Sequence, residues 1–320
     1  MIDPLERWQG LGDKPDYAGL LTFMALPYTQ DPAELVGVDV AIVGAPTDDL
    51  VSDRPGARFG PRAIRAASCP PGPHLEAKID ATRALRMVDF GDAPVIPSDP
   101  ARTRAAIEET VGQVVRAGAV PIVLGGDHSI AEPDLAAVAA VHGPVGLVHF
   151  DTHTDTGTEV FGVEVSHGTP MYRLVEAGLV DPLRYVQIGL RGYWPGEAEF
   201  LWQAERGITS FFMHDVRDRG IGDVVERTVG IVGEGPVFVS VDVDVLDPAF
   251  APGTGTPEPG GMTSADLLWA CRSLAQRLEV AGADVVEVIP AAVGSADVTA
   301  LVAERVVREL VTGIALRRRG

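Results

Sequence analysis

Cysteine is scarce in this sequence, and its scarcity excludes two ways of holding a fold together. The chain contains only Cys69 and Cys271, which are far apart and stand in no CxxC spacing. They cannot supply a framework of disulfides or a cysteine-type zinc site. We therefore expect a protein of the reducing cytoplasm.

Long apolar runs and a secretory leader are also missing. No apolar stretch reaches the roughly 18 to 20 residues that are needed to cross a bilayer. The first residues, MIDPLERWQG, include neither a basic segment nor an apolar one, so they do not have the pattern of a signal peptide. We expect no association with membranes.

Basic residues are few relative to acidic ones. The chain has 26 Lys and Arg against 45 Asp and Glu, which gives a formal net charge of -19. Binding to nucleic acid requires a basic surface, so we expect no nucleic-acid partner. An acidic surface is compatible with a small cationic substrate, although it more commonly serves solubility.

Short apolar runs alternate with amphipathic stretches along the chain. The runs predict strands over 38–44, 120–126, 145–151, 184–190, 237–244 and 283–289. Helices are expected over 100–117, 130–142, 198–206, 220–233, 263–279 and 296–312. Uniformly apolar strands separated by helices predict an α/β fold with a mostly parallel sheet that is covered on both faces. Because no long linker or repeat interrupts this pattern, we expect a single domain over residues 1–320.

Polar clusters stand at the ends of four predicted strands. GGDHS follows VPIVL, DTHTD follows LVHF, DVD closes VFVSV, and EVIP closes ADVV. In a parallel sheet, ligands collect outside the carboxyl ends of the strands. The four clusters are therefore expected to converge on one site.

These clusters have the composition of a metal site. If the strand geometry persists through DTHTD, its Asp, His and Asp side chains project to one side and need a cation among them. The candidate ligands are His128, Asp151, His153, Asp155, Asp242 and Asp244. Four carboxylates and two imidazoles are too many for one tetrahedral zinc and favour hard ions such as Mn²⁺. Two divalent ions would balance the carboxylates, and a water between ions about 3.5–4 Å apart becomes a hydroxide near neutral pH.

Not every histidine near these motifs is expected to bind metal. His149 is interpreted as a core histidine on the side of the strand opposite to His153. A DxD pair alone is a weak signal, because it also occurs in turns and at single-metal sites. GGDH, DxHxD and DxD in succession form a strong signal.

The motifs resemble those of the ureohydrolase family of arginases and agmatinases. RPGARFGPRAIR (54–65), SHGTP (166–170), GTGTP (253–257) and DVVEV (284–288) add to the likeness, which runs from about residue 20 to the end. The resemblance implies an arginase-like, three-layer α/β/α sandwich with two Mn²⁺ ions per chain. It further implies hydrolysis of a guanidino group to urea and an amine, and a homo-oligomer, either a trimer or a hexamer. Residues 1–35 are expected to pack on the domain as an N-terminal extension.

The resemblance also implies roles for single residues. The six candidate ligands match the metal ligands of the family, and Asp155 would in addition pass a proton to the leaving amine. His167 matches a mobile histidine that binds substrate and exchanges protons with solvent. Glu287 matches the acid that pairs with the guanidinium, and Thr256 matches a residue that lines the same pocket.

Departures from the family pattern bear on the substrate. Gly157 stands where arginases carry an asparagine that meets the carboxylate of arginine, so agmatine, hydrolysed to putrescine and urea, is the expected substrate. Val293 replaces an aspartate that agmatinases usually have, in a loop that is one residue longer. Glu159 and Glu164 are expected either to bind a cationic substrate tail or to lie in solvent.

Three alternatives stay open from the sequence. On the same scaffold, the substrate could be guanidinobutyrate, guanidinopropionate or guanidine. A two-metal phosphoesterase would need Lys or Arg aimed at a phosphate, and neither metal motif contains one. A metal-binding protein without activity is the third alternative.

Overall fold

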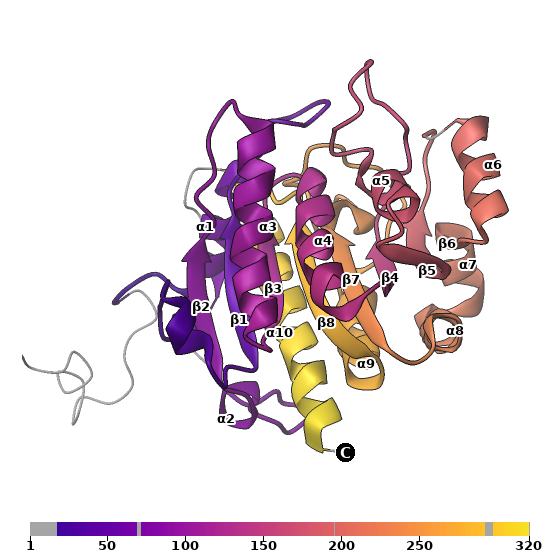
Figure 1. The fold of residues 1–320 in the computed structure, drawn as a ribbon. Coiled ribbons are helices and arrows are strands. Elements are labelled where there is room, and N and C mark those ends of the chain that lie inside the picture. Colours follow the sequence, from indigo (N-terminus) through magenta and orange to yellow (C-terminus); the bar gives the residue numbers. More distant parts are fainter. Residues whose placement is uncertain (1–17, 69–71, 195, 292–296, 320) are drawn as a thin grey trace, which may run out of the picture.

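An eight-stranded parallel sheet forms the centre of the molecule (Figure 1). The computed structural model describes residues 18–68, 72–194, 196–291 and 297–319. The strand order is β2-β1-β3-β8-β7-β4-β5-β6, and every neighbouring pair is parallel. The strands are β1 (Val40–Ala45), β2 (Met87–Asp92), β3 (Val120–Gly125), β4 (Val145–Phe150), β5 (Val180–Leu190), β6 (Thr209–Phe212), β7 (Pro236–Asp242) and β8 (Glu279–Val286). The prediction of a mostly parallel sheet is confirmed.

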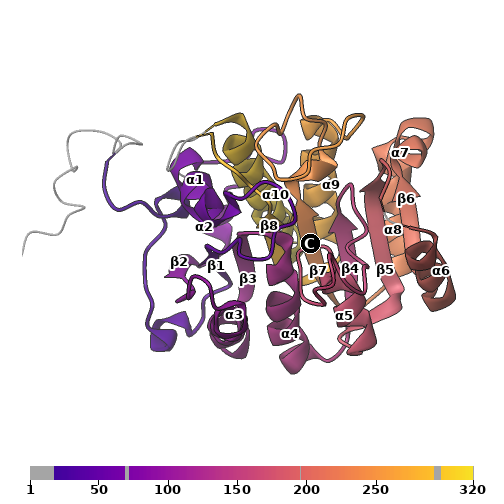
Figure 2. The same ribbon diagram turned by 90° about the horizontal axis from the view of Figure 1, so that it is seen from above.

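Helices cover both faces of the sheet, which gives the predicted three layers (Figure 2). One face carries α3 (Pro100–Arg116), α4 (Ala131–His142), α5 (Pro170–Glu176) and α6 (Glu197–Arg206). The other carries α1 (Gly60–Ala67), α7 (Met213–Arg219), α8 (Ile221–Val232), α9 (Ser264–Arg277) and α10 (Val298–Arg319), with the short α2 (Ala81–Ala84) beside α10. Within the described ranges, no helix combines the length and apolarity that a membrane span requires.

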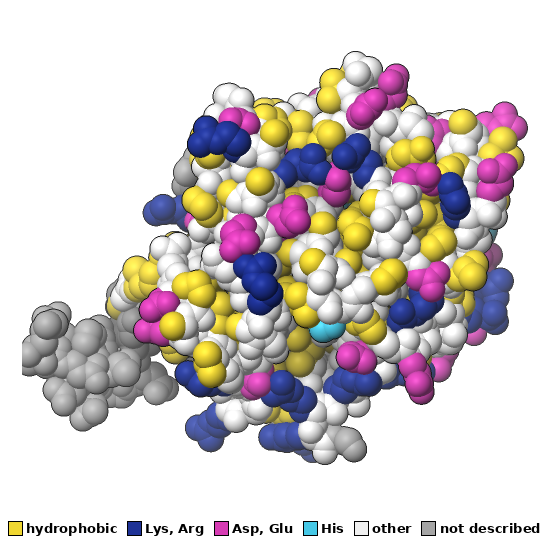
Figure 3. Space-filling view, in the orientation of Figure 1, with side chains coloured by type: hydrophobic (Ala, Val, Ile, Leu, Met, Phe, Trp, Pro, Cys, Tyr) yellow, Lys and Arg dark blue, Asp and Glu magenta, His cyan; other side chains and the backbone are white. Residues whose placement is uncertain are grey.

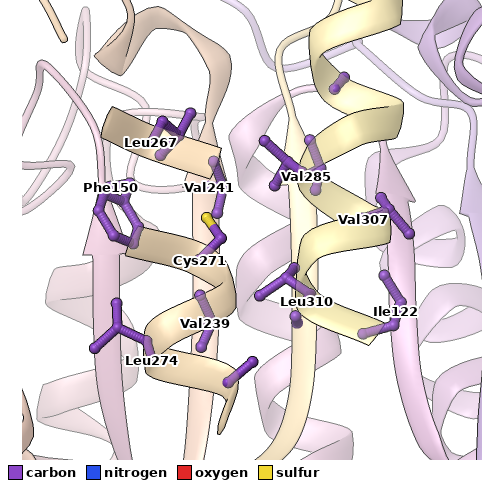
Figure 4. Packing of buried hydrophobic residues seen from close by; sticks show 14 of the residues in the cluster. Ile122, Phe150, Val239, Val241, Leu267, Cys271, Leu274, Val285, Val307 and Leu310 are labelled. Atoms are coloured by element: carbon purple, nitrogen blue, oxygen red, sulfur yellow. The ribbon is translucent and has the colours of Figure 1, made fainter. Parts of the chain in front are cut away.

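The strands are apolar because side chains on both of their faces are buried. Every residue of β1 and of β4 is buried. On one face, Cys271 and Leu274 of α9 and Leu310 of α10 pack over Val239 of β7 and Val285 of β8 (Figure 4). Such contacts remove nearly all of these side chains from water, which is the main source of stability.

Two strands of the sheet, β2 and β6, were not predicted from the sequence, for different reasons. Strand β2 contains Asp89, which is 1% exposed and accepts from Arg65 of α1 through both of its oxygens, at 2.8 and 2.9 Å. A buried acid that pairs with a distant helix breaks the apolar pattern of the strand. Strand β6 has only four residues at the sheet edge, too few for a clear period.

The segment before β1 packs on the sheet where it is described. Phe23 is fully buried, and its N–H donates to Asp89 Oδ2 at 2.7 Å. Residues 1–17 lie outside the described residues, so the single domain over 1–320 and the packing of 1–35 stay predictions. Cys69 and Val293 also lie outside the described residues.

The RPGARFGPRAIR segment packs against the strand ends near the polar clusters. Pro61 stands in the first turn of α1, where its missing N–H and fixed φ suit the start of a helix. A Cβ on Gly60 would lie 2.7 Å from the carbonyl oxygen of Gly125 and 2.9 Å from that of Val288. Glycine is therefore required for this helix to approach the ends of β3 and β8.

Candidate active site

The four polar clusters lie at the ends of four adjacent strands. Strands β3, β8, β7 and β4 are neighbours in the centre of the sheet (Figure 1). His128 begins the turn after β3, and Asp151 follows β4 directly. Asp242 is the last residue of β7, and Glu287 comes directly after β8. The predicted convergence at one end of the sheet is confirmed.

The six candidate metal ligands form two groups that share Asp151. In the first, His128 Nδ1 lies 3.1 Å from Asp151 Oδ2, 2.8 Å from Asp155 Oδ2 and 3.5 Å from Asp242 Oδ2. In the second, His153 Nδ1 lies 3.4 Å from Asp151 Oδ1 and 3.1 Å from Asp244 Oδ2. His128, Asp151 and Asp155, together with His149, lie close enough to hold a metal ion, and so do Asp151, His153 and Asp244.

The way in which DTHTD reaches the site differs from the predicted strand geometry. Strand β4 ends at Phe150, so residues 151–155 form a loop and do not alternate as in a strand. Asp155 has φ +50°, and Glu287 has φ +62°. Such left-handed backbone is costly for residues other than glycine and is frequently found at functional sites. The loop places Asp151 and Asp155, the first and last residues of DTHTD, beside His128 Nδ1.

The donor atoms fit a divalent metal. His128 Nε2 lies 2.9 Å from Ser240 Oγ, whose own hydrogen goes to Asp284 Oδ1 at 2.7 Å. Ser240 therefore accepts from His128, and the Nε2 atom carries the proton. The lone pair of Nδ1 then faces the carboxylates, and the described part of the chain offers this buried atom no hydrogen-bond donor. A nitrogen lone pair among carboxylate oxygens is the arrangement that a metal ion satisfies.

The acids of the cluster cannot all be charged without a compensating cation. Burial raises the pKa of Asp242 well above its usual value, and the charges of Asp244 and Asp151 raise it further. Burial and the charge of Asp151 raise the pKa of Asp244 to about 6. For Asp151, burial raises the pKa, but the neighbouring side chains of His128, His149 and His153 outweigh it and lower the pKa well below the usual value. Two divalent ions would offset the four carboxylates.

His167 and Glu287 stand together beside this cluster. His167 Nδ1 lies 2.9 Å from Glu287 Oε1, which also accepts from the N–H of His128 at 3.0 Å. Burial lowers the pKa of His167, but the hydrogen bond and charge of Glu287 outweigh it and raise the pKa to about 9. The second oxygen, Glu287 Oε2, is buried and has no hydrogen-bond partner among the described residues. It is free to accept from a cationic group.

A cavity of about 290 Å³ opens over the cluster. Its lining consists of Ser52, His153, Asp155, Val160, Phe161, His167, Gly168, Trp194, Asp242 and Thr256. Thr256 lines the cavity and its Oγ1 lies 3.4 Å from Asp244 Oδ2, while its role in binding a substrate stays a prediction. Glu159 and Glu164 are exposed and do not line the cavity. The prediction that they meet the substrate tail is not supported, and the solvent alternative describes them.

His149 is placed differently from the sequence-based interpretation. It is buried and has a partner at each ring nitrogen, as expected for a core histidine. It does not face away from the site, however, because its Nε2 lies 2.9 Å from Asp151 Oδ2. Positions 149 and 151 are two residues apart, so the alternation of side chains in a strand already indicated a shared side.

Other residues of the site were not identified from the sequence. Ser240 stands two residues before Asp242, and the same alternation could have indicated it. Asp127 is fully buried and accepts from the N–H of Ser129 at 2.9 Å, which holds the turn that carries His128. Ser52 Oγ lies 2.7 Å from His167 Nε2, although 115 positions separate them and no local pattern connects them.

Comparisons with known proteins agree with this geometry. The sequence model of the arginase family matches residues 38–313. Guanidinopropionase of Pseudomonas aeruginosa is 45% identical over 280 residues, which cover 86% of this chain and 86% of that protein. Agmatinase of Chromobacterium violaceum is 38% identical over 296 residues, which cover 91% of this chain and 87% of that protein.

A solved structure is similar over almost the whole chain. The structure of proclavaminate amidino hydrolase from Streptomyces clavuligerus superposes with a TM-score of 0.89 at 37% identity and covers 95% of this chain and 100% of that chain. With the motifs, the parallel sheet and the His/Asp cluster at its centre, these matches show that the chain belongs to the arginase, or ureohydrolase, family of enzymes, which hydrolyse C–N bonds in amidines.

Proposed function

We propose that this chain releases urea from a linear guanidino compound in the cavity above the His/Asp cluster. The observation that carries the proposal is Glu287, a buried acid beside a cluster that could hold metal, with one oxygen that no residue in the described ranges contacts by a hydrogen bond. A guanidinium offers several N–H donors in one plane, and a carboxylate is its natural partner. Thr256 and His167 line the cavity, and His167 contacts Glu287, which lies behind it, so the three would form the substrate site.

The charges of the site suit a cationic substrate. Two divalent ions held by His128, Asp151, His153, Asp155, Asp242 and Asp244 would cancel the charge of the four carboxylates, and the charge of Glu287 would remain for the guanidinium. When bound, such ions supply a water that ionises near neutral pH and can attack the guanidinium carbon. The side chains of this protein then have to orient the substrate and move protons.

Proton transfer is assigned to Asp155 and His167. Asp155 lines the cavity, from which it would pass a proton to the leaving amine. His167 contacts Glu287 on one side and Ser52, on the loop after β1, on the other. In this position it would carry protons between the cavity and solvent.

Manganese is the proposed metal, at two ions per chain. The cluster is dominated by carboxylate oxygens, which favour hard ions over tetrahedral zinc. Elemental analysis of active protein should find close to two Mn²⁺ per chain. One zinc per chain at full activity would show that the dinuclear proposal is wrong.

Agmatine is the substrate that the sequence favours, because Gly157 offers no side chain to hold a carboxylate. Trp194 and Phe161 line the cavity, and their aromatic faces would attract the ammonium group of agmatine. A guanidino acid is the second candidate. It is favoured by the solvent positions of Glu159 and Glu164 and by the similarity to guanidinopropionase.

A urea-release assay over a panel of compounds tests the proposal and separates the candidates. The panel contains agmatine, guanidinopropionate, guanidinobutyrate, arginine and guanidine, and kcat/KM is measured for each. Agmatine is expected to lead, and Glu287→Gln should lower its kcat/KM at least about 100-fold, the scale for a lost charge pair in the transition state. If a guanidino acid leads, the second candidate holds.

The assay also separates an enzyme from a metal-binding protein without activity. A protein that binds metal but releases no urea from any compound of the panel would contradict the proposed function. A phosphoesterase is disfavoured because the described residues that line the cavity include no Lys or Arg.

The remaining proposals concern the oligomeric state and the cellular location of the enzyme. The family resemblance supports a homo-oligomer, a trimer or a hexamer, which light scattering would identify from the mass in solution. A cytoplasmic location is supported by the low cysteine content.

A further inference from the structure

A continuous series of buried hydrogen bonds ends on the proposed metal ligand Asp151. The distances are 3.0 Å from Gln187 Nε2 to Tyr185 OH, 3.0 Å from Tyr185 OH to His149 Nδ1 and 2.9 Å from His149 Nε2 to Asp151 Oδ2. All four residues are at most 1% exposed. The paired strands β4 and β5 hold them in place, with His149 in register with Gln187.

The direction of these hydrogen bonds is fixed at Gln187. Its amide lies 3.0 Å from the carbonyl oxygen of Thr154, an atom that can only accept. The amide nitrogen must therefore face Thr154, while the amide oxygen accepts from Ser210 Oγ at 2.9 Å. The second hydrogen of the amide nitrogen is donated to Tyr185 OH.

This direction determines the tautomer of His149. Because Tyr185 OH accepts from Gln187, its own hydrogen is donated to His149 Nδ1. A neutral imidazole that accepts at Nδ1 carries its proton on Nε2. His149 therefore donates to Asp151 Oδ2.

From this series we propose that His149 is a positioning residue of the metal centre, with Tyr185 and Gln187 setting its tautomer. The inference rests on the proposed metal centre. Asp151 is shared by both ligand groups, so its orientation affects both. Its Oδ1 atom accepts from the N–H of His153 at 2.5 Å, and its Oδ2 atom accepts from His149. Both oxygens are thus held in place by donors from the protein, which orients the carboxylate for metal.

The competing possibility is that His149 is itself a ligand, because it lies within reach of His128, Asp151 and Asp155. Ligation through Nε2 would move the proton to Nδ1, which faces Tyr185 OH. That oxygen already accepts from Gln187, so the tyrosine hydrogen would have no acceptor among the partners that the described part of the chain provides. A buried hydroxyl without an acceptor is costly, which disfavours ligation by His149.

Metal binding by Tyr185→Phe tests the proposal without any substrate. The variant removes one hydroxyl and keeps the ring. Metal-free protein is titrated with Mn²⁺ alone, and the free ion is followed by electron paramagnetic resonance. The affinity of the variant should fall about tenfold, at the lower end of the effect of losing an outer partner of a ligand. Gln187→Met should act in the same direction, to a smaller extent.

Thr228→Val is the matched control. It also removes a buried hydroxyl, which donates to the carbonyl oxygen of Val224 within α8. Its Mn²⁺ affinity should equal that of the wild type. Equal affinities in Tyr185→Phe and Thr228→Val would overturn the proposal.

The tautomer of His149 provides a second measurement, which needs no variant. In wild-type protein loaded with Zn²⁺ as a diamagnetic probe, ¹⁵N spectra of the histidines should show His149 protonated at Nε2. A proton at Nδ1 with a metal-bound Nε2 would identify a ligand and overturn the proposal. Both measurements omit guanidino compounds, so a failure to release urea would contradict the proposed function and leave this inference standing.

Discussion

Two acidic residues of the site, Asp155 and Glu287, are buried and have an unfavourable left-handed backbone conformation. Asp155 and Glu287 both have positive φ, and both stand at the cavity or beside it. A fold keeps such residues only where the surroundings hold them firmly. In this protein the neighbouring strands β3, β8, β7 and β4 supply that rigidity.

The two ligand groups predict separate losses of metal. His128→Ala affects the first group and Asp244→Ala the second, and each should lower the content from two Mn²⁺ to about one while the fold is kept. Urea release should fall at least about 100-fold, because losing a metal ligand costs more than losing a hydrogen-bond partner of a ligand. Elemental analysis and the urea assay measure both effects. Asp218→Ala, at an exposed position, is the control. Wild-type turnover in either ligand variant would show that the assignment is wrong.

The contact between His167 and Glu287 predicts a pH-dependent contribution to stability. Burial opposes protonation of His167, but Glu287 outweighs it and raises the pKa to about 9. Since this is above the value of about 6.5 in an unfolded chain, the stabilisation is complete below about pH 6.5 and is lost as the pH rises through about 9. It amounts to at most about 3 kcal/mol.

Denaturation of metal-free protein measures this contribution. The loss of unfolding free energy caused by His167→Gln should be largest at pH 6 and should shrink towards pH 9.5. His142→Gln, at the exposed end of α4, should show no such trend. If the loss of unfolding free energy in His167→Gln does not change with pH, the contact with Glu287 is not the source of the pH-dependent stability.

At the scale of elements, the approach of α1 to the strand ends depends on Gly60. Because a Cβ would meet two backbone carbonyls, Gly60→Ala should lower the free energy of unfolding by about 1–3 kcal/mol. Gly222 in α8 has open space around its Cβ position, so Gly222→Ala should instead stabilise by about 0.5–1 kcal/mol. Urea denaturation compares the two variants. Similar effects would show that α1 can move away from the sheet.

The long elements could be predicted from the sequence, whereas the short ones could not. Helix α9 was predicted over 263–279 and begins after Thr263, whose Oγ1 caps it by accepting from the N–H of Asp266 at 3.1 Å. Helices α5 and α7 have seven residues each, too few for a clear period. The carboxyl-terminal LRRR belongs to α10, where its cations lie in the last turn and complement the helix dipole.

At the scale of the whole molecule, the acidic net charge does not form one continuous surface on the face shown in Figure 3. Basic and acidic side chains are interspersed there. Many of the acids that matter for function are instead buried, including Asp151, Asp242 and Asp244. The stability of the protein should therefore depend on metal.

Chelation of the metal should destabilise the protein more at high pH than at low pH. In metal-free protein, burial and Asp151 raise the pKa of Asp244 to about 6, above the value of about 3.9 in an unfolded chain. Its ionisation therefore costs stability as the pH rises through about 6. Adding Mn²⁺ to chelated protein should raise the Tm more at pH 8 than at pH 5, because a bound cation removes this cost. Equal increases at the two pH values would contradict this account.

The sequence by itself determined the family, the parallel α/β architecture and the identity of the residues that converge at the strand ends. The family followed from the resemblance of its motifs to those of ureohydrolases. The architecture and the convergence could be predicted because apolar runs and strand ends are local features, and the carboxyl ends of parallel strands meet at one edge of a sheet. Only the tertiary structure decided which side chains pair with one another by hydrogen bonds and ion pairs. The contact of Ser52 with His167, the pairing of Arg65 with Asp89 and the direction of the hydrogen bonds from Gln187 to Asp151 join separate segments of the chain. Such contacts depend on how elements pack, and no period or spacing within one segment encodes them.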